Sequence, residues 1–97
     1  MKFDKIKSLL PDYAKDIKLN LSSLSNETIL EKNTFAGTAL TSSLTTQNRL
    51  LTENIAEEAK EILSDKELSA SYTAASLMAM NNIYYRSIHL ISNKNYQ

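Results

Sequence analysis

Three polar residues near the carboxyl end of the chain, Asn82, Tyr85 and His89, have the types and the spacing to act together. Because side chains three and four residues apart meet on one side of an α-helix, a helix here presents all three on one face. In a polar pocket, a histidine on that face can transfer protons. Alternatively, Tyr85 and His89 only satisfy hydrogen bonds beneath packed helices, and the residue types alone favour this structural interpretation.

The rest of the sequence offers few groups for catalysis or metal binding. It has no cysteine and one histidine, which excludes disulfides and a thiol nucleophile and argues against a zinc site. One face of a predicted helix carries a charged, mainly acidic cluster, as either a metal site or a solvated surface. It comprises Glu53, Glu57, Glu58, Lys60 and Glu61. We favour the solvated surface, since no histidine accompanies them, and we predict no catalytic residue, metal or cofactor in this chain.

Charge and hydropathy narrow the possible partners and locations. The sequence has 11 basic and 11 acidic residues, so its formal net charge of zero gives no long-range attraction for nucleic acids or anionic membranes. No stretch has the apolar length that crosses a bilayer, and the amino-terminal apolar stretch is too short for a signal peptide. We therefore expect a cytoplasmic protein that binds neither nucleic acid nor membrane.

The composition favours an all-α fold in one domain over residues 1–97. The sequence has no valine, one glycine and one proline, whereas sheets need β-branched residues and turn glycines. The apolar spacing predicts about four helices. The first runs from Pro11 to Leu24 after a turn at residues 4–10. Its apolar side comprises Tyr13, Ile17, Leu21 and Leu24.

Cap residues and apolar spacing predict the next two helices. Ser25 and Asn26 offer cap oxygens for the second helix. Its apolar side comprises Ile29, Ala36, Leu40 and Leu44, and that of the third helix comprises Leu51, Ile55, Ala59 and Ile62. Gly37 lies inside the second helix, where a glycine costs about 1 kcal/mol relative to alanine. Either another helix approaches closely at Gly37, or the glycine is a tolerated weak point.

A capping box, Ser64 followed three residues later by Glu67, predicts the start of the longest helix, which runs to about Ile91. This helix has two apolar stripes. One comprises Leu68, Tyr72, Ala75 and Ala79, and the other comprises Leu77, Met80, Tyr84, Ile88 and Ile91. Because a helix that is apolar on most sides is buried on most sides, we expect this long final helix to be the central one.

Three segments of the sequence resemble the amino-terminal half of AhpD-type alkylhydroperoxidases, in the carboxymuconolactone-decarboxylase-like superfamily. They are LPDYAKDIKLNLSSL at Leu10–Leu24, FAGTALTSSLTTQNRLL at Phe35–Leu51 and MAMNNIYYRSIHLI at Met78–Ile91. The resemblance implies an AhpD-like all-helical, oligomeric antioxidant protein. Members of this family reduce hydroperoxides with thiols, and they pass electrons from a lipoylated dehydrogenase component to a partner peroxiredoxin.

The resemblance also implies that the chemistry of this family lies outside the present residues. The family uses a Glu, a Cys-x-x-Cys and a following His in its carboxy-terminal half, and no position here matches them. We expect a truncated or split protein that is inactive alone and that forms a homo-oligomer or binds a complementary carboxy-terminal half. The alternative is a non-catalytic helical oligomerisation or binding module. Asn82, Tyr85 and His89 share the spacing of the Cys, Cys and His, either as a degenerate counterpart of that motif or by coincidence.

Overall fold

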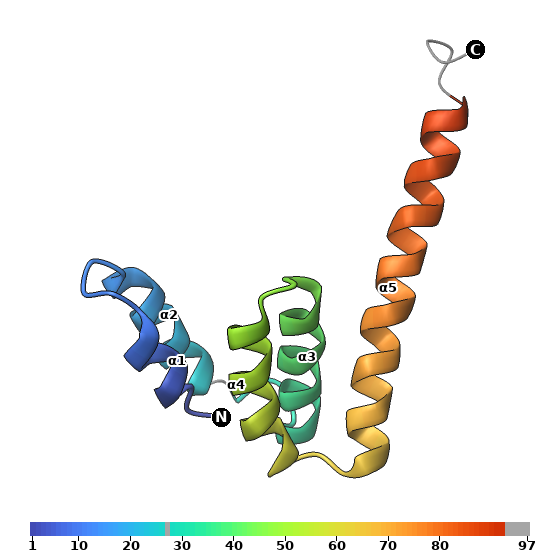
Figure 1. The fold of residues 1–97 in the computed structure, drawn as a ribbon. Helices are drawn as coiled ribbons and strands as arrows, with labels where there is room; N and C mark the ends of the chain where they lie inside the picture. The colour runs from blue at the N-terminus through green and yellow to red at the C-terminus, as the bar shows by residue number, and fades with distance from the viewer. Residues whose placement is uncertain (27, 93–97) are drawn as a thin grey trace.

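The computed structural model describes residues 1–26 and 28–92, and these residues form five α-helices and no strand (Figure 1). In chain order the helices are α1 (Asp4–Leu9), α2 (Lys15–Ser25), α3 (Lys32–Thr45), α4 (Arg49–Lys60) and α5 (Asp65–Ser92). The predicted all-α fold is therefore confirmed. Most of the segment expected to be a turn at residues 4–10 is α1, which brings the count to five helices among the described residues.

The core lies where α3 packs against α4, with the amino-terminal residues closing one side. The apolar stripe predicted for the third helix is confirmed, since Ile55 and Ala59 of α4 are buried and Leu51 and Ile62 are partly buried. Leu40 of α3 is the one large side chain that is fully buried among the described residues. The complete buried apolar set is Phe3, Ile6, Ala36, Leu40, Ile55, Ala56, Ala59 and Leu63. Three of these eight residues are alanines, whose small side chains let the two helices approach closely.

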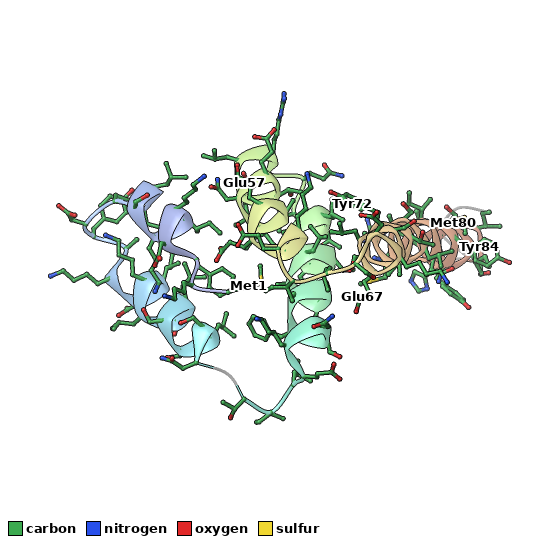
Figure 2. All side chains as sticks on the ribbon, turned by 90° about the horizontal axis from the view of Figure 1, so that it is seen from below. Met1, Glu57, Glu67, Tyr72, Met80 and Tyr84 are labelled. Carbon is green, nitrogen blue, oxygen red and sulfur yellow. The ribbon has the colours of Figure 1, made fainter. Side chains whose placement is uncertain are left out.

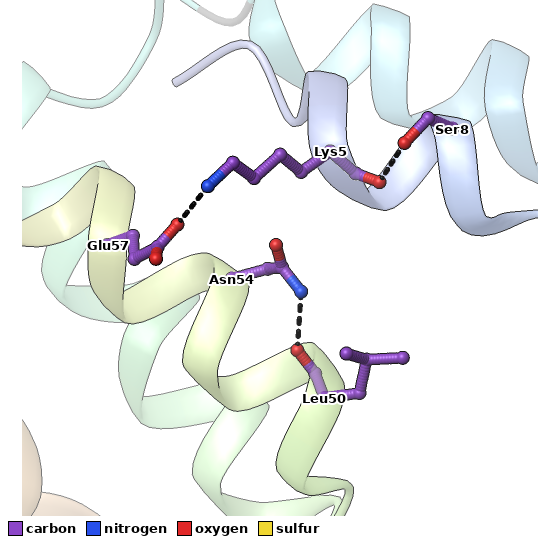
Figure 3. A network of polar contacts seen from close by, with 5 residues as sticks. All are labelled: Lys5, Ser8, Leu50, Asn54 and Glu57. Carbon is purple, nitrogen blue, oxygen red and sulfur yellow. Dashed lines mark hydrogen bonds and ion pairs between the residues drawn. The ribbon is translucent and has the colours of Figure 1, made fainter.

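The amino terminus is fastened to α4 by polar contacts as well as by apolar packing. The backbone N–H groups of Lys2 and Phe3 donate to Glu58 Oε1, at 2.8 and 3.1 Å. Lys5 Nζ donates to Glu57 Oε2 at 2.7 Å across the interface of α1 and α4 (Figure 3). Both lysine and glutamate are well exposed, so this ion pair contributes little to stability and loses strength in salt.

The contact between α3 and α5 is close at Gly37, which decides between the two interpretations of that glycine. A methyl group built on Gly37 would lie 3.3 Å from Ser71 Oγ of α5. Thr41 Oγ1 of α3 also donates to the Ser71 carbonyl oxygen at 3.1 Å. The glycine therefore offsets its low helix propensity by letting the backbone of α5 approach.

The capping box at the start of α5 is confirmed and has a third member. Ser64 N donates to Glu67 Oε1 at 2.9 Å, and Glu67 N donates back to Ser64 Oγ at 3.2 Å. Asn33 Nδ2 of α3 adds contacts of 3.1 and 3.0 Å to the two oxygens of the same carboxylate. The cap of α5 is thus also a polar link to α3.

The predicted starts of the first two helices are wrong. Residues 11–14 form a turn, so α2 begins at Lys15 rather than Pro11, and Tyr13 is 90% exposed. The second predicted helix begins at Lys32 instead of following Asn26, because the Asn26 side chain donates to the Ser22 carbonyl and so ends α2. Its predicted apolar residue Ile29 consequently precedes the helix and is 89% exposed.

The expectation that the long final helix is covered on most sides is not met within this chain. Helix α5 lies on one flank of the bundle, and only Ser71 on it is buried (Figure 1). Residues 76–92, which we call distal α5, are exposed throughout and project beyond the other helices. The prediction of a central helix is therefore wrong for the described residues, because an apolar pattern does not say whether a neighbouring element is present to cover it.

Candidate functional site

The three polar residues predicted as a candidate site lie on distal α5. Asn82, Tyr85 and His89 are all exposed, and the Tyr85 ring meets the Tyr84 ring edge-on with centroids 5.5 Å apart. Figure 2, which looks along α5, shows no other helix beside the labelled Met80 and Tyr84. The three residues therefore share a face of one helix, and no other described residues close over them to enclose a substrate.

That face continues the side of α5 that packs on α3. Ser71 and Ala74 face α3, where they line a cavity together with Thr41 of that helix. Residues spaced three and four positions apart along α5 form one continuous row on this same side of the helix. The row comprises Ser71, Ala74, Met78, Asn82, Tyr85 and His89, and we call it the seam row. Its second half extends past the end of α3, as Figure 1 shows for the helix itself.

Three acidic side chains of α4 accept hydrogen bonds within the protein. Lys5 accounts for the lowered pKa of Glu57, first through its hydrogen bond and then through its charge. Glu58 accepts backbone N–H groups, and Glu53 accepts from Arg49 Nε at 2.8 Å. Across the described ranges 1–26 and 28–92, no group of three or more ligating side chains is placed to hold a metal ion. Sequence reasoning missed Lys5, because a partner 52 positions away leaves no local signal.

A second candidate site is an apolar groove between α2 and the pair α3 and α4, with a volume of about 500 Å³. Leu21 and Leu24 of α2 form one wall, while Phe35 and Ala39 of α3 and Leu51 of α4 form the other. No residue of α2 is buried, since the groove separates much of its apolar side from the core. The apolar spacing of α2 was visible in the sequence, but the open groove beside it was not.

The carboxylate of Glu67 is the other electrostatic feature of the structure. Its pKa lies below the ordinary value of 4.5, chiefly because Ser64 N–H donates to it and because Asn33 adds a side-chain hydrogen bond. These donors stabilise the charged form at the amino end of α5, where the helix dipole also favours an anion. The arrangement links α3 to the start of α5.

Fold and site together define a class: an all-helical chain without cysteine, whose last helix is exposed over residues 76–92. No protein-family model matches the sequence. Proteins named alkyl hydroperoxide reductase AhpD do match it. The chain is 44% identical over 91 residues to that of Gluconacetobacter diazotrophicus, a match that covers 94% of this chain and 50% of that protein. The protein of Corynebacterium kroppenstedtii is 48% identical over 87 residues, covering 90% of this chain and 50% of the relative. That of Maricaulis maris is 46% identical over 96 residues, covering 99% and 56%.

The chain is therefore AhpD-like, as its three resembling segments predicted, and it spans about half the length of the curated relatives it matches. No helix among the described residues is long and apolar enough to cross a membrane.

Proposed function

We propose that this chain is the structural half of an AhpD-type hydroperoxide reductase and that it acts only with a cysteine-bearing half. Two facts support the proposal. The relatives named AhpD match it over half of their length, and its own sequence has no cysteine. Electron transfer from a lipoylated dehydrogenase component, and onward to a peroxiredoxin, would then belong to the cysteine-bearing half.

The chemistry of hydroperoxide reduction explains why a second half is needed. A thiolate attacks the O–O bond, which gives a sulfenic acid and an alcohol, and a second thiol then condenses to a disulfide and releases water. A dithiol reductant returns the pair to its starting state. Asn82 and Tyr85 have the spacing of such a thiol pair, but an amide and a phenol can form neither a sulfenic acid nor a disulfide. His89 alone supplies a proton carrier without a nucleophile.

The observation that carries the proposal is the seam row. Its first members, as far as Met78, line the cavity beside α3, and Asn82, Tyr85 and His89 continue the same side of the helix with no other helix of the described residues opposite them. A helix of the cysteine-bearing half placed in line with α3 would cover Met78 and Tyr85. Burying side chains of this size stabilises by roughly 1.5–3 kcal/mol each. The degenerate face of α5 would thus hold the active half without entering its redox cycle.

The test combines this chain with the separately produced cysteine-bearing half of the Maricaulis maris relative, because 99% of the present chain matches that protein. Reduction of cumene hydroperoxide by dihydrolipoamide should be higher in the mixture than with either half alone. Tyr85→Asp should weaken the complex by about tenfold or more, since 1.4 kcal/mol of lost burial corresponds to a factor of ten. Tyr13→Asp is the matched control, because Tyr13 is 90% exposed and lies far from the seam row.

Two results would contradict the proposal. One is turnover by the isolated chain above a boiled control that disappears in His89→Ala, which would show an activity of its own. The other is a mixture in which the two halves neither elute together nor gain activity.

A further inference from the structure

The apolar groove beside α2 has the size and the lining of a small-molecule site. Its volume of about 500 Å³ falls within the range of roughly 300–1,000 Å³ that ligand pockets occupy. Phe3 and Ile55 are buried and close its base, while Leu21 and Leu24 of α2 stand opposite Ala39 of α3. Helix α5 contributes no residue to the lining. The groove is therefore separate from the seam row, on which the proposed function depends.

The lining of the groove restricts the chemistry of what can bind there. Among the described residues that line it, none carries a charge. An ionised carboxylate or ammonium group in the groove would lose its water without gaining a partner of opposite charge, which is costly. The lining also holds no histidine, cysteine or carboxylate, so it offers no group that would transform a bound molecule. These features fit the binding of an uncharged, mainly apolar molecule.

Four residues of α3 bring hydroxyl groups to the groove, and two of these groups are available to a ligand. Ser43 Oγ donates to the Leu40 carbonyl, and Thr46 Oγ1 donates to the Ser43 carbonyl, each at 2.7 Å. The hydroxyls of Thr38 and Ser42 have no hydrogen-bond partner among the described residues. Both residues are exposed and lie one helical turn apart, at the edge of the groove. They can therefore bond together to one polar group of a ligand.

We propose that this groove binds a neutral aliphatic molecule with a single hydroxyl group, such as a medium-chain alcohol. The hydroxyl bonds to Thr38 and Ser42, and the chain extends past Ala39 toward Phe3. Burial of the chain supplies the affinity, and the uncharged lining excludes ionised head groups. The volume also favours a slender molecule over a partner helix. A cube of 500 Å³ has edges of about 8 Å, whereas a helix with its side chains is about 10–12 Å across.

Helix α2 is attached in a way that makes it responsive to a bound molecule. It has no buried residue, and the side-chain hydrogen bonds that Ser22 and Ser25 donate stay within the helix. No side chain of α2 bonds to another helix of the described part of the chain, so apolar contacts such as that of Leu21 hold it to the core. An aliphatic chain that touches both walls adds to those contacts. Binding should therefore slow hydrogen exchange of the α2 amides.

Titration of the isotope-labelled full chain with decanol, below its solubility limit and followed by nuclear magnetic resonance, tests the proposal. The signals of Leu21, Leu24 and Ala39 should shift and saturate. Those of Leu77 and Ile88, which are exposed apolar residues of distal α5, should not saturate at the same concentrations. Decanoate, which has a chain of the same length and a charged head group, should bind at least about tenfold more weakly.

Two substitutions with matched controls test the walls and the edge of the groove. Ala39→Phe should weaken decanol binding by about tenfold or more, because its ring takes the space of the ligand, whereas Ala79→Phe on distal α5 should leave it unchanged. Thr38→Val should weaken binding severalfold by removing one hydrogen bond. Thr34→Val is its control, since the Thr34 hydroxyl faces the cavity beside α5 instead. Circular dichroism of the four variants reports whether they remain folded.

Four results would overturn the proposal. One is decanol shifts confined to distal α5, and another is equal affinity for decanol and decanoate. The third is a set of groove signals that change with protein concentration in the absence of decanol, since a second copy of the chain would then be the occupant. The last is loss of decanol binding when the cysteine-bearing half of the Maricaulis maris relative is added, because the groove would then be a contact between halves.

Discussion

Replacing Gly37 with alanine sets two effects of similar size against each other at the contact of α3 and α5. Alanine is more favourable than glycine inside a helix by about 1 kcal/mol. The new methyl group, however, would lie 3.3 Å from Ser71 Oγ, which is a few tenths of an ångström too close. Ser71 is buried, and its hydroxyl donates to the Glu67 carbonyl at 2.9 Å, so it cannot swing away without losing that bond. We expect the two effects to cancel to within about 0.5 kcal/mol of unfolding free energy.

A double-mutant cycle separates the two effects. In a Ser71→Ala background the obstacle is gone, so Gly37→Ala should stabilise by about the full 1 kcal/mol. Ser76→Ala is the matched control, because the Ser76 hydroxyl also donates to a carbonyl four residues earlier but is exposed. Urea denaturation followed by circular dichroism measures all three backgrounds. A gain of about 1 kcal/mol from Gly37→Ala in every background would refute the reasoning, because the close approach would then have no energetic effect.

Two further predictions concern the core and the cap of α5. Leu40→Ala should destabilise the protein by about 2–5 kcal/mol in thermal denaturation, because Leu40 is fully buried. Leu19→Ala is the control. Its side chain is 65% exposed, so this substitution should change the stability by less than about 0.5 kcal/mol. The lowered pKa of Glu67 means that its charged form is favoured by folding, so its stabilisation is present above 4.5 and is lost as the pH falls through the lowered value. Denaturation midpoints between neutral pH and strong acid should therefore show a shallower acid loss in Glu67→Gln, and an unchanged slope would contradict the role given to Ser64 and Asn33.

Local signals predicted the parts of the fold that local interactions determine. The capping box at Ser64 and Glu67 and the apolar stripe through Ile55 of α4 appear in the structure as expected. The start of α3 was misplaced because Asn26 can cap a following helix or close a preceding one, and only the packing decides. The same limit applied to α5, whose apolar sides were visible without their neighbours.

The sequence predicted that the candidate residues share one helix face, but it did not predict what surrounds that face. The spacing of Asn82, Tyr85 and His89 fixes their common face once the segment is helical. Their continuity with Ser71, which packs on α3, needed the structure, because no spacing rule says where the neighbouring helix ends. The apolar groove could not be predicted from the sequence either, because its walls come from helices that are separated in sequence.

The free end of α5 has a consequence for how the helix responds to dilution. A helical segment without tertiary contacts is only marginally stable in water, so distal α5 depends on hydrogen bonds that open by fraying from its carboxyl end. Its amide protons should exchange with solvent far faster than those of α3, and proteases should cut here first. Any partner that covers the segment will slow both processes, so the order of this helix, and with it the measured helix content, will rise with the concentration of its partner.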